Sequence, residues 1–116
     1  MSKRPINLLL NDISQAIDRI EQYIENLSFD VFSKDQKSVG AVVRNLEIIG
    51  EAANRLPDEF REKYSEIEWY KVVGLRHRIV HEYFGIDLEI IWQILQKDLP
   101  ELKQKLTQIM SDEGAG

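Results

Sequence analysis

The chain has 116 residues, of which 43% are hydrophobic and 30% charged, and its formal net charge is −5. These values indicate one globular domain with a packed core rather than a disordered chain. The acidity argues against a protein that coats nucleic acid without selectivity. Cysteine is absent, which excludes disulfides and thiolate metal sites. Because we find neither a signal peptide nor a long apolar run, we expect a cytoplasmic protein without membrane spans.

The first half of the chain shows apolar residues at the three- and four-residue spacing of amphipathic helices. This pattern predicts one helix from about Pro5 to Leu27 and a second from about Lys34 to Leu56. Between them, Ser28 begins a predicted loop. Ser33 and Gln36 have the spacing of a capping box, so we expect Ser33 to cap the second helix.

The second half continues the helical pattern. A short helical turn is predicted from Asp58 to Tyr64, followed by a third helix from about Glu68 to Tyr83 that Gly85 terminates. A fourth helix, capped by Asp87, should extend to Ile109. Pro100 should bend this helix or begin a new segment after Leu99.

No segment shows the alternation of β-branched and polar residues that predicts a strand. The sequence therefore predicts an all-α fold. We expect a single helical domain over residues 1–110 and a flexible tail over residues 111–116, which is small, polar and rich in glycine.

The third predicted helix carries the most chemistry. Arg76, His81 and Tyr83 form an R-x4-H-x-Y pattern, and residues 69–83 sum to a charge of +2, which leaves −7 for the rest of the chain. A local basic patch on an acidic body suits a focused anionic ligand, although charges can also cluster by chance on a solvated helix face. Guanidinium can bind a phosphate through two parallel hydrogen bonds, and imidazole exchanges protons near neutral pH.

His77 and His81 are four residues apart and so share one helix face. A metal pair is a weak interpretation, because Arg78 follows His77 where a zincin helix has glutamate, and we predict neither a metal nor another cofactor. Acid–base chemistry is the stronger interpretation, since RNA cleavage by a 2′-hydroxyl needs one group to accept a proton and one to donate it. The two imidazoles could be His77 and His81 of one chain, or two copies of His81 across a dimer axis. His77 could equally be a structural residue.

Two further side chains have a candidate functional role beside an ordinary one. Tyr83 shares a face with Arg76 and could contact a base or phosphate, or simply lie in an interface. Glu51 borders an apolar face of the second helix and could pair with Arg76 or Arg78, or be solvated. Trp69 and Trp92 have the spacing of core or dimer aromatics.

The motif and the segments around it resemble a known family. Arg76, His81 and Tyr83, followed by Phe84-Gly85-Ile86-Asp87, resemble the signature of HepT-like proteins, a branch of the HEPN superfamily. Residues 45–53, 69–75 and 91–100 are similar to the family's second helix, to the lead into its motif and to its final helix. The resemblance covers residues 40–106. Glu68 stands where a proline often precedes the tryptophan.

The resemblance implies a fold, an activity and partners. The fold would be a four-to-five-helix up-down HEPN bundle, forming a homodimer with the motif helices facing a shared cleft. The activity would be metal-independent endoribonuclease toxicity in a type VII-like toxin–antitoxin system. Arg76 and His81 match the family's catalytic pair, and His77 occupies the polar position after that arginine. Beside this pair, we take His77, Glu51 and Arg78 as supporting candidates, Glu51 and Arg78 from their own chemistry. The partner would be an MNT-type nucleotidyltransferase antitoxin that transfers AMP to Tyr83. The alternative is a non-catalytic HEPN subunit that binds a nucleotide or docks a nucleotidyltransferase.

Overall fold

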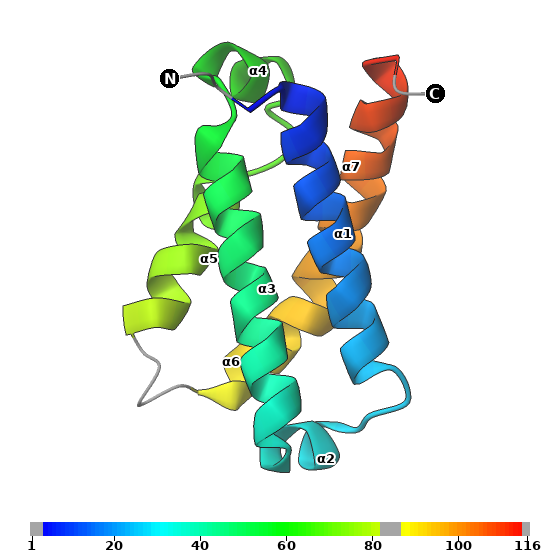
Figure 1. Cartoon of the computed structure of the whole chain (residues 1–116), viewed down its shortest axis with the longest axis vertical. Coiled ribbons are helices and arrows are strands. Elements are labelled where there is room, and N and C mark those ends of the chain that lie inside the picture. The colour runs from blue at the N-terminus through cyan, green and yellow to red at the C-terminus, as the bar shows by residue number, and fades with distance from the viewer. Residues whose placement is uncertain (1–3, 82–86, 115–116) are drawn as a thin grey trace.

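The computed structural model describes the backbone of residues 4–81 and 87–114 and the side chains of residues 4–76 and 87–114. Within these residues the fold is all-α. Helices α1 (Ile6–Ile24) and α3 (Gln36–Arg55) lie side by side and antiparallel. Helix α5 (Trp69–His81) packs on α3, and α7 (Leu99–Asp112) packs on α1 (Figure 1). The predicted up-down helical bundle is therefore confirmed.

Shorter helices connect the long ones. Helix α2 (Phe29–Lys34) lies at one end of the bundle and α4 (Asp58–Lys63) at the other, the end at which the described chain begins and ends (Figure 1). Helix α6 (Leu88–Gln93) begins where Asp87 accepts a hydrogen bond from the amide of Glu89, as predicted. None of the helices in the described ranges is long and apolar enough to cross a membrane.

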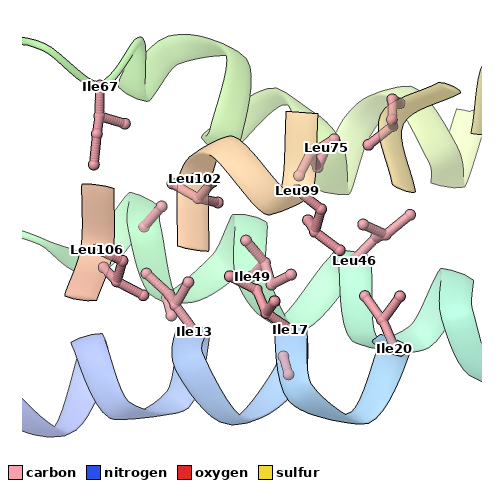
Figure 2. Close-up of a cluster of buried hydrophobic side chains, with 14 of the residues drawn as sticks. Ile13, Ile17, Ile20, Leu46, Ile49, Ile67, Leu75, Leu99, Leu102 and Leu106 are labelled. Carbon is pink, nitrogen blue, oxygen red and sulfur yellow. The ribbon is translucent and has the colours of Figure 1, made fainter. Parts of the chain in front are cut away.

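The core lies where the four long helices meet (Figure 2). Helices α1, α3 and α7 turn stripes rich in leucine and isoleucine inward, and α5 adds Trp69 and Leu75, which removes apolar surface from water and drives folding. The buried side chains drawn and labelled there are Ile13, Ile17, Ile20, Leu46, Ile49, Ile67, Leu75, Leu99, Leu102 and Leu106. Trp69 is also buried, and its indole N–H donates to the carbonyl of Tyr64. Trp92 packs on the rings of Phe29 and Phe32.

The predicted loop and helix cap between α1 and α3 are wrong. Ser28 is the cap of α2, because its hydroxyl accepts from the amide of Val31. Ser33 lies inside that helix and donates to a backbone carbonyl. Asp35 caps α3 instead, since its carboxylate accepts from the amides of Lys37 and Ser38. A charged acceptor makes stronger hydrogen bonds than a hydroxyl, and it therefore sets the start of α3.

Pro100 begins a new segment, as predicted, and a π-helical turn precedes it. In η2 (Ile94–Asp98) the chain widens, and the amide of Leu99 donates to the carbonyl of Ile94, five residues back. Proline lacks the N–H that would bond the carbonyl of Gln96, and its ring crowds that carbonyl. A wider turn relieves the clash, and the regular helix α7 then resumes at Leu99.

The C-terminal segment differs in part from the expected tail. Helix α7 continues to Asp112, so two residues of the segment 111–116 belong to the helix. Glu113 then accepts hydrogen bonds from Lys63 and from the hydroxyl of Tyr64. These contacts hold the end of α7 against α4. They explain why the helix continues past Ser111 although the segment is small and polar.

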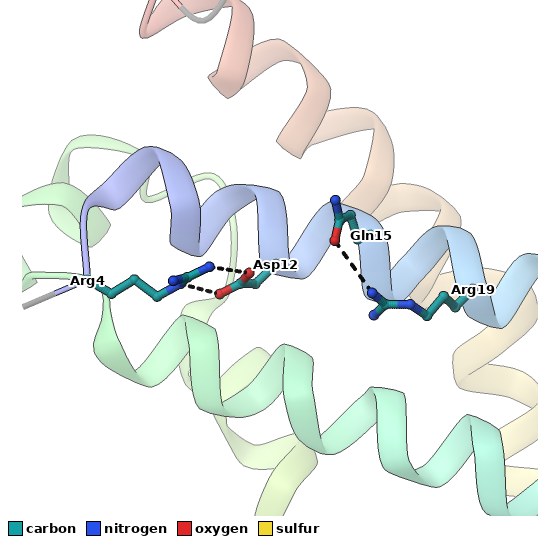
Figure 3. Close-up of polar contacts among 4 residues, drawn as sticks. All are labelled: Arg4, Asp12, Gln15 and Arg19. Atoms are coloured by element: carbon teal, nitrogen blue, oxygen red, sulfur yellow. Dashed lines mark hydrogen bonds and ion pairs between the residues drawn. The ribbon is translucent and has the colours of Figure 1, made fainter.

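Polar contacts tie the N-terminal half together (Figure 3). Arg4 makes a two-pronged ion pair with Asp12, at 2.7 and 2.9 Å. Arg19 contacts Gln15 on its own helix and, at 3.4 Å, the side-chain oxygen of Asn45 on α3. Asn45 is the buried polar side chain of the described core, and its amide donates to the carbonyl of Ala41. Its role is therefore to join α1 to α3.

Candidate active site

Helix α5 carries the predicted catalytic residues. Its backbone is helical from Trp69 through His81, so Arg76, His77 and His81 all lie on one rigid element. In a regular helix, His77 and His81 fall on the same face on successive turns, whereas Arg76 lies about 100° from His77 and 140° from His81 around the axis. By helix geometry, the position of Arg76 therefore lies on a different side of α5 from the two histidine positions.

Several of the predicted residues lie outside the described part of the chain. This holds for the side chains of His77, Arg78 and His81, and for all of Tyr83 and Gly85. Their catalytic or supporting roles, and the end of the third helix beyond His81, stay predictions. The side chain of Arg76 is described, and its surroundings define the candidate site.

Gly50 sets the distance between α3 and α5. A Cβ atom built on Gly50 would lie 2.8 Å from the backbone nitrogen of Arg76, 3.0 Å from its Cβ and 3.1 Å from the carbonyl oxygen of Val73. All three distances are shorter than a normal contact, so only a glycine allows this approach. A glycine inside a helical pattern is the sequence signal of such a close crossing, although the pattern does not identify the partner helix. The backbone of Arg76 is thus held directly against α3.

One hydrogen-bond donor of the Arg76 guanidinium, its Nε, lacks an acceptor among the described residues. Its Nε is buried and makes no hydrogen bond within the described part of the protein. A buried donor without an acceptor costs free energy. Guanidinium groups bind phosphates and carboxylates through pairs of N–H donors, so an anion at this edge of α5 would interact favourably with Arg76.

Glu51 does not supply that acceptor. It follows Gly50 on α3, but its side chain is exposed, and among the described residues no ion pair joins it to Arg76. The predicted Glu51–Arg76 pairing is therefore not formed in the structure. The physical reason is the crossing itself, which presents the small Gly50 to α5 and leaves the next side chain in solvent. Pairing with Arg78 stays a prediction.

The start of α5 is also polar. Lys71 pairs with Glu68 at 3.1 Å, and the hydroxyl of Tyr70 donates to the same carboxylate. The hydrogen bond from Lys71, with that from Tyr70, lowers the pKa of Glu68, and the carboxylate in turn raises the pKa of Lys71. Both groups therefore stay ionised over a wide pH range. Sequence patterns alone do not single out Tyr70, although it lies seven residues before His77.

Metal binding receives no support from the described side chains. No group of three or more histidine, cysteine, aspartate or glutamate residues among them could hold a metal ion. Both histidines fall outside that search, so the expectation of metal-free chemistry stays a prediction.

Comparison with known proteins shows the family to which the chain is related. The family HepT-like, described as "Ribonuclease HepT-like", matches residues 13–109. The chain is 41% identical over 104 residues to "Putative RNase TTE0752" from Caldanaerobacter subterraneus, covering 90% of this chain and 93% of that protein. It is 37% identical over 107 residues to "Probable ribonuclease HepT" from Thermococcus cleftensis, covering 92% of this chain and 97% of that protein. No solved structure matches the chain.

A third relative shows the same domain as part of a larger protein. The chain is 38% identical over 110 residues to "Gamma-glutamylcyclotransferase and putative RNase MJ0434" from Methanocaldococcus jannaschii, covering 95% of this chain but 50% of that protein. The helical bundle and the family match define a HEPN protein of the ribonuclease type. The chain belongs to the HepT-like ribonuclease family, since the match extends over most of its length.

Proposed function

We propose that the protein is a metal-independent endoribonuclease whose active site is built on α5. The observation that carries this proposal is the guanidinium of Arg76. Its backbone is fixed against Gly50, and its Nε is buried without an acceptor in the described residues. A pre-positioned cation of this kind suits a phosphate on which negative charge develops during reaction.

The chemistry can be written from the residues of the motif. A neutral imidazole removes the proton from the 2′-hydroxyl of the RNA, and the 2′-oxygen attacks the adjacent phosphorus. A 2′,3′-cyclic phosphate forms as the bond to the 5′-oxygen breaks, and a protonated imidazole donates its proton to that leaving oxygen. Arg76 stabilises the charge on the phosphate. His81 supplies one imidazole, and a second His81 from another protomer, or His77 of the same chain, supplies the other.

The protein would act as the toxin of a type VII-like system. An MNT-type nucleotidyltransferase antitoxin would transfer AMP to the hydroxyl of Tyr83, two residues beyond His81. The AMP phosphate would bring an anion close to the cation that binds the RNA, and the nucleotide would also block access. The family match and the names of the relatives support the ribonuclease part of this proposal, and the antitoxin and Tyr83 parts rest on the resemblance of the motif.

The first experiment measures cleavage of single-stranded RNA in EDTA. We expect the purified protein to cut RNA, and His81→Ala and Arg76→Ala to lower the rate by about a hundredfold or more while remaining helical by circular dichroism. Arg55→Ala is the matched control, because Arg55 is an exposed arginine at the end of α3. Cleavage that requires a divalent ion would refute the mechanism. RNA or nucleotide binding without cleavage would favour the non-catalytic subunit.

The second experiment tests the modification. Incubation with the nucleotidyltransferase, ATP and magnesium should add the mass of AMP to the wild-type chain, with loss of cleavage. Tyr83→Phe should keep most of its cleavage and gain no mass. Neutralisation without a mass gain, or with AMP on another residue, would favour tight binding of the antitoxin instead.

A further inference from the structure

Tyr70 is unusual among the aromatic residues of this protein. Its side chain is 72% exposed, whereas the other exposed large hydrophobic residues of the described chain range from 37% to 51%. The preceding Trp69 is buried, so α5 turns one ring into the core and the next into solvent. The hydroxyl of Tyr70 donates to Glu68, which itself pairs with Lys71. The ring is therefore held in place at its polar end while its faces stay open.

Tyr70 lies on the same face of α5 as the two histidine positions. The helix is continuous from Trp69 to His81, and Tyr70, Gly74, His77 and His81 are spaced by four, three and four residues. Eleven residues make about three turns of an α-helix, so Tyr70 and His81 lie nearly in line, about 16 Å apart along the axis. The motif helix thus has an exposed aromatic ring on the side that carries its histidines.

Among the described residues, nothing covers α5 at Gly74. A Cβ atom built on Gly74 would have no neighbouring atom of the described chain within 4 Å. Gly74 therefore differs from Gly50, which lies against the backbone of Arg76 and Val73. A ligand could follow α5 from Tyr70 past Gly74 without meeting a side chain at that position.

We propose that Tyr70 is a stacking platform for a base of the single-stranded RNA substrate, away from the phosphate that is cut. This inference rests on the proposed function, since it assigns a substrate contact to the same site. Successive nucleotides of a stacked strand advance by about 3.4 Å, so the stacked base lies within about five nucleotides of the scissile bond. Aromatic rings that stack on bases are a common means of binding single strands without sequence preference.

The surroundings of Tyr70 favour a base over a protein partner. Its exposed neighbours along the chain are polar or charged, namely Ser65, Glu66, Glu68 and Lys71. A protein interface buries a group of apolar side chains, which this region lacks. A single planar ring, with its hydroxyl already bonded, is sufficient for one base.

The test compares Tyr70→Leu with Tyr70→Phe in steady-state cleavage of single-stranded RNA. Leucine keeps an apolar side chain but removes the aromatic face, whereas phenylalanine keeps the face and removes the bond to Glu68. We expect Tyr70→Leu to raise KM by about five- to 150-fold with kcat within about twofold of wild type. The KM of Tyr70→Phe should stay within about threefold of the wild-type value. Tyr23→Leu, at a 40% exposed tyrosine on α1, is the matched control and should be unchanged.

A series of oligonucleotides shortened from either end tests whether the KM effect comes from a base that contacts Tyr70. On substrates too short to reach Tyr70, wild type and Tyr70→Leu should have equal KM values. Equal values on long RNA as well would overturn the inference. A loss for Tyr70→Leu that is confined to kcat would overturn it too. A changed molecular mass of Tyr70→Leu in solution would also overturn it, because it would indicate that Tyr70 lies in a protein interface. A wild-type protein that cuts no RNA would instead refute the proposed function.

Discussion

At the scale of single residues, Asp35 illustrates how one carboxylate decides where a helix begins. The Ser33–Gln36 spacing led to the prediction of Ser33 as the cap, and it did not single out Asp35. Asp35 accepts hydrogen bonds from two amides and, at 2.8 Å, from the hydroxyl of Ser38. Because these donors stabilise the ionised form, the Ser38 hydroxyl above all lowers the pKa of Asp35. Spacing alone could not rank the two caps.

This pKa shift makes part of the stability depend on pH. Since the pKa of Asp35 is lower in the folded protein than in the unfolded chain, its charge stabilises the fold at neutral pH, and this stabilisation is lost as the pH falls through the folded pKa. Asp35→Asn keeps a good cap but removes the charge. We expect it to lower the urea midpoint at neutral pH, with a difference from wild type that shrinks as the pH falls through the folded pKa of Asp35. A difference that persists unchanged in acid would contradict this assignment.

Arg76 shows which part of the site the sequence could reveal. Its spacing to His81 identified it as a candidate, because few residue types can bind a phosphate in this way. Its surroundings could not be predicted, since they depend on how two helices cross. The contact of its backbone with Gly50 arises from this crossing.

At the scale of the helices, apolar spacing predicted the long elements well. The expected second helix, Lys34 to Leu56, is observed as Gln36–Arg55, and the short turn after Pro57 is observed as α4. The expected first helix ends earlier, at Ile24, and Asn26 has a φ of 63°. Asparagine tolerates this left-handed conformation better than most residues. Helix α2 was missed because six residues are too few to show a period.

The crossing of α3 and α5 can be tested with a pair of glycines. Gly50→Ala places a methyl group against the backbone of Arg76 and Val73, which cannot rotate away as a side chain could. The clash should outweigh the gain of about 1 kcal/mol in helix propensity, so we expect a net loss of about 1–2 kcal/mol and slower RNA cleavage. Urea unfolding and the cleavage rate measure the two effects.

Gly40→Ala provides the matched control for this substitution. Gly40 lies on the same helix, and a Cβ atom built on it meets no neighbour within 4 Å. Helix propensity should then stabilise the protein by up to about 1 kcal/mol, with cleavage unchanged. If both substitutions changed stability in the same direction, α3 and α5 would not be in the close contact described.

At the scale of the whole molecule, composition and periodicity were sufficient to predict an all-α bundle with one core. How α1, α3, α5 and α7 pack, with α5 on α3 and α7 on α1, depends on contacts between distant segments and could not be read from the spacing within each helix. A homodimer is a prediction from family resemblance, because a single chain carries no trace of its partner. The composite active site is the part of the proposal that depends on it.

Mixing experiments test whether two protomers share the site. If cleavage needs His81 from both chains, equal amounts of wild-type and His81→Ala chains should exchange into pairs. Only about half of the wild-type chains would then keep a wild-type partner. Activity per wild-type chain should fall to about half, whereas mixing with Arg55→Ala chains should leave it unchanged.

A monomeric mass with full activity would exclude the shared site. An equal loss from His77→Ala in a protein that still dimerises would instead assign the pair to one chain.

The approach of Gly50 to Arg76 also has a consequence for amide hydrogen exchange. The backbone nitrogen of Arg76 lies so close to α3 that no water fits between the two helices at this point. Its hydrogen can therefore exchange with deuterium only when the two helices separate. The amide of Tyr70, in the first turn of the same helix, has no such cover and should exchange quickly. The exchange rate at one backbone position thus reports how often the motif helix leaves its support, before any RNA is added.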